Sequence, residues 1–170
     1  MENNNEKSDA LQDDPEYYFN EEHFASLVLN SDDFREKNLT EIRNLVGLLN
    51  TKDHKSKSEA LQILKKQDGR EMLLFAISSD EFREFRQALV ASCWESGLDF
   101  SSYLEFFVQL ILGSDFGISM EACTVIECME GELKEPARSV CLTKLREYSD
   151  IHQEKRELIL PILEFLSNRI

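Results

Sequence analysis

The segment Ala88–Gly97, with the sequence ALVASCWESG, decides the expected fold because its layout occurs three times in the chain. An alanine precedes a glycine by nine positions here, in Ala60–Gly69 (ALQILKKQDG) and in Ala122–Gly131 (ACTVIECMEG). The alanines lie 28 and 34 positions apart, and apolar residues take corresponding places after each of them. A layout that recurs at this spacing is typical of stacked helical hairpins. We therefore expect an all-α fold.

Apolar residues outside these segments also recur at helical spacing. Ile42, Leu45, Val46 and Leu49 follow an i, i+3, i+4, i+7 pattern, and no stretch alternates between apolar and polar residues as a strand would. The capping box Ser56-x-x-Glu59 predicts a helix start, and Gly69 predicts a left-handed helix end. Together these signals predict four helical hairpins, near residues 39–67, 69–97, 100–131 and 134–168.

Two of the second helices carry a further resemblance. The segments RQALVA (86–91) and MEACTV (120–125) resemble second helices of the HEAT/armadillo class of helical repeats, and KSEALQ (57–62) fits less closely. The resemblance implies a short right-handed α–α superhelix of about four HEAT-like hairpins, whose second helices line a concave face. In that class the concave face commonly binds proteins and less often nucleic acid. The last hairpin departs from the pattern, with Ile159 and Asn168 where alanine and glycine would stand.

Residues 1–38 differ in composition from the rest, so we divide the chain into an acidic N-terminal segment (1–38) and a HEAT-like helical repeat domain (39–170). The first fifteen residues are polar and acidic and are expected to be disordered. Phe24, Leu27 and Val28 have helical spacing and predict a short amphipathic helix near residues 21–29. Two roles remain open for this segment: a cap over the end of the array, or a docking peptide for another protein.

The overall composition disfavours several classes of binding partner. The net charge of −14 disfavours nucleic acid and anionic membranes by long-range repulsion. The longest apolar stretch, residues 103–112, is too short to span a bilayer, and no apolar run follows a basic start as in a secretory signal. The four cysteines form no C-x-x-C pair and lie within helical patterns. We therefore expect a cytoplasmic protein without a membrane segment.

Alignment on the three alanines predicts which side chains of the second helices point away from the core. Positions i, i+4, i+7 and i+11 lie on one stripe of a helix, and we assign these stripes to partner binding. Trp94, the single tryptophan, is the best candidate for an anchor, because tryptophan is enriched among binding hot spots. Alternatively, it leans back over a helix end as part of the core. The predicted partner-binding residues are Lys55, Gln62 and Lys66 of the first hairpin, Arg83, Gln87, Val90 and Trp94 of the second, and Glu121 and Thr124 of the third.

Positive charge gathers in the first hairpin of this acidic protein. Such a cluster forms either a solvated face or a docking patch for an anionic group, supplied by the acidic N-terminus or by a partner. The cluster consists of Lys52, Lys55, Lys57, Lys65, Lys66 and Arg70.

Catalytic and metal-binding patterns are not recognisable in the sequence. His23, His54 and His152 lie in three different segments, and none accompanies a serine or cysteine in a nucleophile motif. Four glutamates between positions 127 and 135 lack the alternating spacing of a calcium loop and predict a solvated acidic turn. We therefore expect no enzymatic activity, no cofactor and no metal site.

The sequence thus predicts a non-catalytic protein–protein interaction module, an adaptor or regulatory subunit that binds another protein on the concave face of a helical-repeat stack. Two alternatives remain. One is nucleic-acid binding or DNA-glycosylase-like activity through the Lys-rich first hairpin, which would require a strongly basic groove. The other is a subunit whose apolar side packs within a larger assembly.

Overall fold

The computed structural model describes the backbone of residues 31–169 and the side chains of residues 38–169. This part of the chain contains eight α-helices, three short 3-10 helices and no strand, in agreement with the all-α prediction. The α-helices are α2 (Ser31–Leu49), α3 (His54–Gln67), α4 (Arg70–Ser78), α5 (Arg86–Glu95), α6 (Leu104–Gly113), α7 (Phe116–Glu127), α8 (Ala137–Ile151) and α9 (Arg156–Asn168). The 3-10 helices are η2 (Asp80–Phe85), η3 (Ser101–Tyr103) and η4 (Gln153–Lys155).

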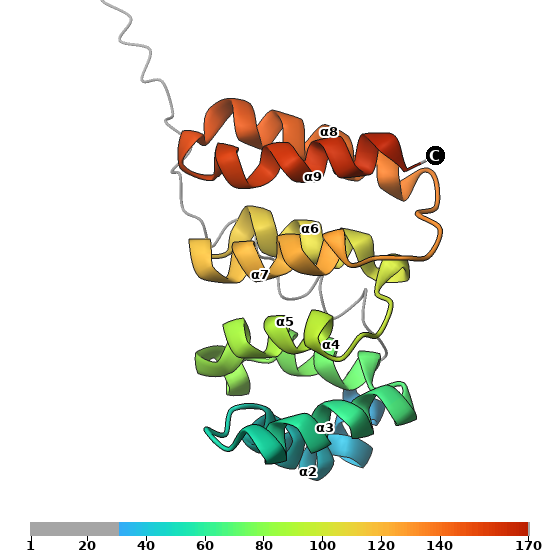
Figure 1. The fold of residues 1–170 in the computed structure, drawn as a ribbon, viewed down its shortest axis with the longest axis vertical. Coiled ribbons are helices and arrows are strands. Elements are labelled where there is room, and N and C mark those ends of the chain that lie inside the picture. The colour runs from blue at the N-terminus through green and yellow to red at the C-terminus, as the bar shows by residue number, and fades with distance from the viewer. Residues whose placement is uncertain (1–30, 170) are drawn as a thin grey trace, which may run out of the picture.

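The α-helices occur as four consecutive pairs. Within the pairs, α2 contacts α3, α4 contacts α5, α6 contacts α7 and α8 contacts α9. The pairs coincide with the four predicted hairpins and follow one another along the long axis of the molecule, from α2 and α3 at one end to α8 and α9 at the other (Figure 1). Between pairs, α5 contacts α7 and α7 contacts α9, so the second helices of the last three pairs form one layer.

The core consists of the apolar residues that the helical periodicity marks. In α4, Leu73, Leu74, Ala76 and Ile77 are fully buried. At the start of the third pair, the ring of Phe107 packs edge-on against Phe100, with 5.5 Å between the ring centroids, and a second edge-on contact joins it to its neighbour in α6. Edge-to-face packing is a favoured arrangement of buried aromatic rings.

The first pair, α2 and α3, contacts its neighbouring pair through different helices than the later pairs do. Helix α2 contacts both α4 and α5, whereas α3 packs against α2 and is linked to α5 by an ion pair of 2.7 Å between Lys57 Nζ and Glu95 Oε2. Ala60 is buried at the α2–α3 contact, Ala122 is buried within α7, and Ala88 is half-buried. The three aligned alanines therefore differ in burial, and Ala88 is the one that departs from the other two.

Several helix ends differ from the sequence prediction. Helix α2 spans Ser31–Leu49, so it includes residues 31–38, ahead of the start that the sequence predicted near residue 39. Helix α3 begins at His54, and its N-cap is Asp53, whose carboxylate accepts hydrogen bonds from the N–H groups of Lys55 and Ser56. At the other end of α3, Asp68 takes the left-handed conformation with φ 54°, and the predicted Gly69 does not. The predictions for residues 1–30 lie outside the described residues.

Basic side chains bind the carbonyl groups at the ends of several helices. Arg86 Nε donates to Ile77 O at 2.8 Å, at the C-terminal end of α4, and Arg138 Nη1 donates to Leu166 O of α9 at 2.8 Å. Arg169 Nη1 donates to Met129 O at 2.6 Å, just beyond α7. The last carbonyls of a helix lack partners within it and carry partial negative charge, so a cation stabilises them. These bonds connect helices within and between pairs.

Among residues 31–169, no helix combines the length and the apolar character that crossing a bilayer would require.

Candidate partner-binding surface

The side chain of Trp94 connects α5 to α7. Its indole Nε1 donates a hydrogen bond of 2.9 Å to Oε2 of Glu121, which lies 27 positions later in the chain. The ring is 37% exposed, so the alternative in which Trp94 is an ordinary core residue does not hold. A buried or half-buried tryptophan N–H needs a partner, and here the partner fixes the orientation of the ring while part of the ring stays accessible.

Gln87 and Gly117 form a second contact between the same two helices. Gln87 is exposed on α5, and a Cβ added to Gly117 would lie 2.8 Å from its Oε1 atom. The absence of a side chain at Gly117 therefore leaves room for the glutamine side chain over the first turn of α7. The predicted residues Gln87, Trp94 and Glu121 thus lie together along the α5–α7 contact.

Two exposed apolar side chains lie on α7, the helix that carries Glu121. Phe116 is 56% exposed and Met120 is 43% exposed, and their i, i+4 spacing places them on one side of the helix. Thr124 lies one turn further along and donates from Oγ1 to Met120 O at 3.2 Å. We define the α5–α7 surface as Gln87, Trp94, Phe116, Met120, Glu121 and Thr124.

The α5–α7 surface combines accessible aromatic and thioether groups with polar groups in fixed positions. Aromatic residues and methionine are enriched in protein–protein interfaces relative to the rest of the surface. Sequence alignment on the alanines did not identify Phe116 and Met120. The signal that could have found them is the amino-acid pattern of α7, which carries apolar residues at more positions than one buried face can hold.

The prediction for Val90 is wrong. This residue is fully buried, although the stripe assignment placed it with Trp94. Helix α5 contacts α2, α4 and α7, and these three neighbours leave only a narrow strip of it exposed. A residue at the edge of that strip is therefore covered.

The other predicted residues are exposed but lie on different elements. Arg83 is exposed in η2, ahead of α5. Lys55, Gln62 and Lys66 are exposed on α3, which packs against α2 rather than within the layer of α5, α7 and α9. Helix packing therefore brings together the predicted residues of the second and third pairs and leaves those of the first pair on a separate surface.

The basic cluster of the first hairpin is partly neutralised. Lys57 pairs with Glu95, and Arg70 Nε lies 2.5 Å from Oδ1 of Asp68. The pKa of Asp68 is lowered mainly by the hydrogen bond from Arg70. Lys65 and Lys66 form no ion pair with a described residue. The ammonium groups of these two lysines and of Lys52 are therefore the members of the cluster that can contact an anionic partner.

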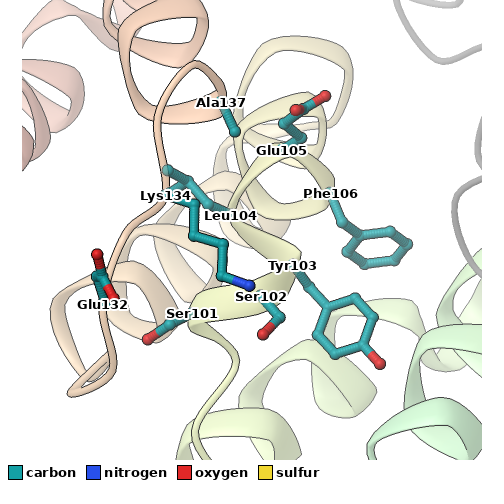
Figure 2. A pocket seen from close by; sticks show the side chains of 9 residues that line it. All are labelled: Ser101, Ser102, Tyr103, Leu104, Glu105, Phe106, Glu132, Lys134 and Ala137. Carbon is teal, nitrogen blue, oxygen red and sulfur yellow. The ribbon is translucent and has the colours of Figure 1, made fainter.

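A cavity of about 250 Å³ lies between the start of α6 and the segment that leads into α8 (Figure 2). Lys134 extends from that segment toward Ser102 and Tyr103 in Figure 2, and Glu105 and Glu132 also line the cavity. The lining contains charges of both signs and no histidine, so it presents no nucleophile with an adjacent imidazole base. The cavity is lined by Ser101, Ser102, Tyr103, Leu104, Glu105, Phe106, Glu132, Lys134 and Ala137.

Asp99 organises the backbone next to this cavity. Its Oδ1 accepts hydrogen bonds from Ser101 N at 3.2 Å, Ser101 Oγ at 2.6 Å and Glu130 N at 3.1 Å. Burial alone would raise the pKa of Asp99, but these bonds and one from the N–H of Gly131 outweigh it, so the pKa is below its ordinary value. Asp99 therefore joins the loop before α6 to the loop after α7.

The histidines and acidic residues within residues 31–169 form no recognisable chemical centre. No group of three or more histidine, cysteine, aspartate or glutamate side chains there is arranged to hold a metal ion. His152 stacks on Tyr148 with 4.1 Å between ring centroids, and its Nδ1 lies 3.4 Å from Glu154 Oε1. These contacts account for His152 as a packing residue at the end of α8.

Compared with known protein families, curated proteins and solved structures, the chain matches none of them. We therefore base the functional proposal on the α5–α7 surface and on the packing of the helix pairs.

Proposed function

We propose that this protein is a non-catalytic interaction module that binds another protein through the α5–α7 surface. The observation that carries this proposal is the hydrogen bond between Trp94 Nε1 and Glu121 Oε2, which holds a partly exposed indole in one orientation against α7, the helix that also carries two exposed apolar side chains. An anchor that is ordered before binding loses little conformational entropy when the partner arrives. Tryptophan in such a setting is among the residues that most often dominate binding energy.

A HEAT-like stack is the architecture that we propose for this module. The four helix pairs and the contacts in series among α5, α7 and α9 support it. In a right-handed superhelix of this kind the layer of second helices is the concave side, which would place the α5–α7 surface at its centre.

The chemistry of the surface favours a partner segment with apolar side chains and positive charge. Trp94, Phe116 and Met120 offer apolar area, and Glu121 adds a carboxylate beside them. The protein as a whole carries a net charge of −14, which attracts basic partners and repels acidic ones. We infer an adaptor or regulatory role, because the described residues supply binding groups and no catalytic pair.

Nucleic-acid binding through the first hairpin receives less support. Lys57 and Arg70 are already engaged by acidic groups of the chain, so fewer cations are available for phosphate contacts. A gel-shift assay with duplex DNA at low salt checks this point, and tight binding would favour nucleic acid over a protein partner.

Affinity capture with the full-length protein tests the proposed function. Partners recovered from the source cells are identified by mass spectrometry, and recovery is compared among wild type, Trp94→Ala and Met120→Ala. The matched control is Val140→Ala on α8, because Val140 is apolar and 43% exposed, as is Met120. We expect Trp94→Ala to lower recovery of a specific partner at least about tenfold, equivalent to about 1.4 kcal/mol. Equal recovery with Trp94→Ala and with the control would refute the proposal.

A further inference from the structure

An apolar groove lies at the α2–α3 end of the described stack, away from the α5–α7 surface. Its volume is about 180 Å³, and it lies between α2 and α3 with Met72 of α4 at its margin. Leu48 and Ile63 line it from opposite helices and are 42% and 49% exposed. We define the α2–α3 groove by its lining residues Glu41, Asn44, Leu45, Leu48, Ala60, Ile63, Leu64, Gln67 and Met72.

The helix that forms one wall of this groove is basic. Helix α3 contains four lysines and one glutamate. Lys66 follows Ile63 by three positions and therefore lies on the same side of α3, and it forms no ion pair with a described residue. Glu41 is the one acidic residue of the lining. An apolar groove beside an uncompensated lysine fits a segment that is both apolar and acidic.

The segment of residues 16–28, EYYFNEEHFASLV, has this composition. Tyr17, Tyr18 and Phe19 form one apolar group, and Phe24, Leu27 and Val28 form a second. Residues 1–30 contain eight acidic residues and one lysine, which is half of the net charge of −14 of the whole chain. The positive charge is therefore on α3, and the complementary negative charge is in the segment that directly precedes α2.

The connection to α2 gives this segment the necessary reach. The groove begins 10 residues and ends 17 residues after Ser31, which corresponds to about 15–26 Å along the helix. An extended chain spans about 3.3 Å per residue, so Phe24 can lie about 23 Å from Ser31 and Phe19 about 40 Å from it. Leu27 and Val28 span at most about 13 Å and 10 Å from Ser31 and stop short of the groove, whereas Phe24 and the group at residues 17–19 can reach it in the same chain.

We propose that residues 16–24 of the same chain occupy the α2–α3 groove. Phe24 contacts the end of the groove near Leu45, and the group at residues 17–19 contacts Leu48 and Ile63. Glu21 and Glu22, between the two groups, face Lys66. The occupied groove covers the exposed apolar side chains of the first helix pair. This docking is independent of the proposed function, because the two sites share no residue.

Photo-crosslinking within the full-length protein tests the docking. The photo-reactive residue p-benzoylphenylalanine replaces Ile63 in one variant and Leu160 in a control variant, because Leu160 is apolar, 45% exposed and located on α9. We expect crosslinks from position 63 to residues 16–24 within one chain, and none to these residues from position 160. Crosslinks between two chains would show that a second copy fills the groove, and absent crosslinks would show that the segment does not dock. Either result overturns the proposal.

Hydrogen exchange provides a second measurement in the full-length protein. We expect the backbone amides of residues 17–24 to exchange at least about tenfold faster in Ile63→Asp than in wild type, and Leu160→Asp to leave their exchange unchanged. If Ile63→Asp disturbs the fold, the double substitution Phe19→Ser and Phe24→Ser replaces it, since it leaves residues 31–169 intact. That variant must abolish the crosslinks from position 63, and their persistence would overturn the proposal.

Discussion

The ammonium group of Lys155 lies 2.8 Å from the carbonyl oxygen of Ile111, and 44 positions of sequence separate the two residues. Lys155 ends η4 just before α9, and Ile111 lies in the last turn of α6. The same ammonium also donates to Ser114 O, and it lies 5.6 Å from the centroid of the Tyr148 ring. Lys155 is almost fully buried, so a single side chain joins the end of α6 to the start of α9.

Loss of this cation is expected to destabilise the fold. Lys155→Met keeps the volume of the side chain but removes its hydrogen bonds to the α6 carbonyls, which are worth more than neutral bonds because the donor is charged. Burial lowers the pKa of Lys155, and the same desolvation offsets part of the gain from these bonds. We expect a net loss of about 1–3 kcal/mol in the free energy of unfolding, measured by urea denaturation. Lys134→Met, at an exposed position, serves as the control and should change stability by less than about 0.5 kcal/mol.

Leu89 and Trp94 occupy the same helix but should respond differently to truncation. Leu89→Ala leaves a cavity at a fully buried position and should cost about 2–5 kcal/mol in unfolding free energy. Trp94→Ala removes a partly exposed ring and one hydrogen bond to Glu121 and should cost about 1 kcal/mol. Thermal and urea denaturation of both variants measure the difference. Similar large losses for the two would show that Trp94 acts as a core residue and does not serve as an anchor.

The same substitution at Gly69 and Gly117 should have opposite effects. A Cβ at Gly69 would lie 2.3 Å from Cδ2 of Leu64, a buried side chain that cannot move freely, so Gly69→Ala should cost about 1–3 kcal/mol. A Cβ at Gly117 would meet only the end of the exposed Gln87 side chain, which can turn away. Alanine also favours the helix, so Gly117→Ala should raise stability by up to about 1 kcal/mol. Urea denaturation distinguishes the two signs, and a loss at both positions would contradict the expected freedom of Gln87.

Asp99 should make stability depend on pH in the acid range. Its pKa in the folded protein is below the ordinary value of about 3.9, so its stabilising contribution is present above that value and is lost as pH falls through the lower, folded pKa. Asp99→Asn cannot accept all of these hydrogen bonds and should destabilise the protein by about 1 kcal/mol at pH ~7. The difference between wild type and variant should shrink below pH ~4. A difference that stays constant down to pH ~2 would show that the carboxylate charge plays no part.

Helical periodicity was sufficient to predict the four helix pairs. In α6, for example, the apolar residues of 104–112 are buried in the structure. The helix ends were harder to predict, because they depend on single side chains. The start of α2 was missed because the apolar pattern begins only at Ile42, and Gly69 was expected to be left-handed where Asp68 takes that conformation.

The binding surface was predicted only in part, because exposure depends on the neighbours of a helix. The alignment on alanines treats all second helices as equivalent, which holds best for α5 and α7. Val90 is covered because α2, α4 and α7 all contact α5, and no property of residues 83–94 indicates the position of α2. The α2–α3 groove likewise arises from the packing of two helices and has no local sequence signal.

Because three of the four cysteines are buried, the native chain offers a single accessible thiol for chemical labelling. Cys93, Cys123 and Cys141 are buried, and desolvation raises the pKa of Cys93 and raises those of Cys123 and Cys141 to about 12. These three thiols are therefore almost entirely protonated and unreactive near neutral pH. Cys128 is exposed at the end of α7, and its backbone N–H bonds to Thr124 O at 3.1 Å. A maleimide fluorophore attached there, without any substitution, would report the arrival of a binding partner by a change in its emission.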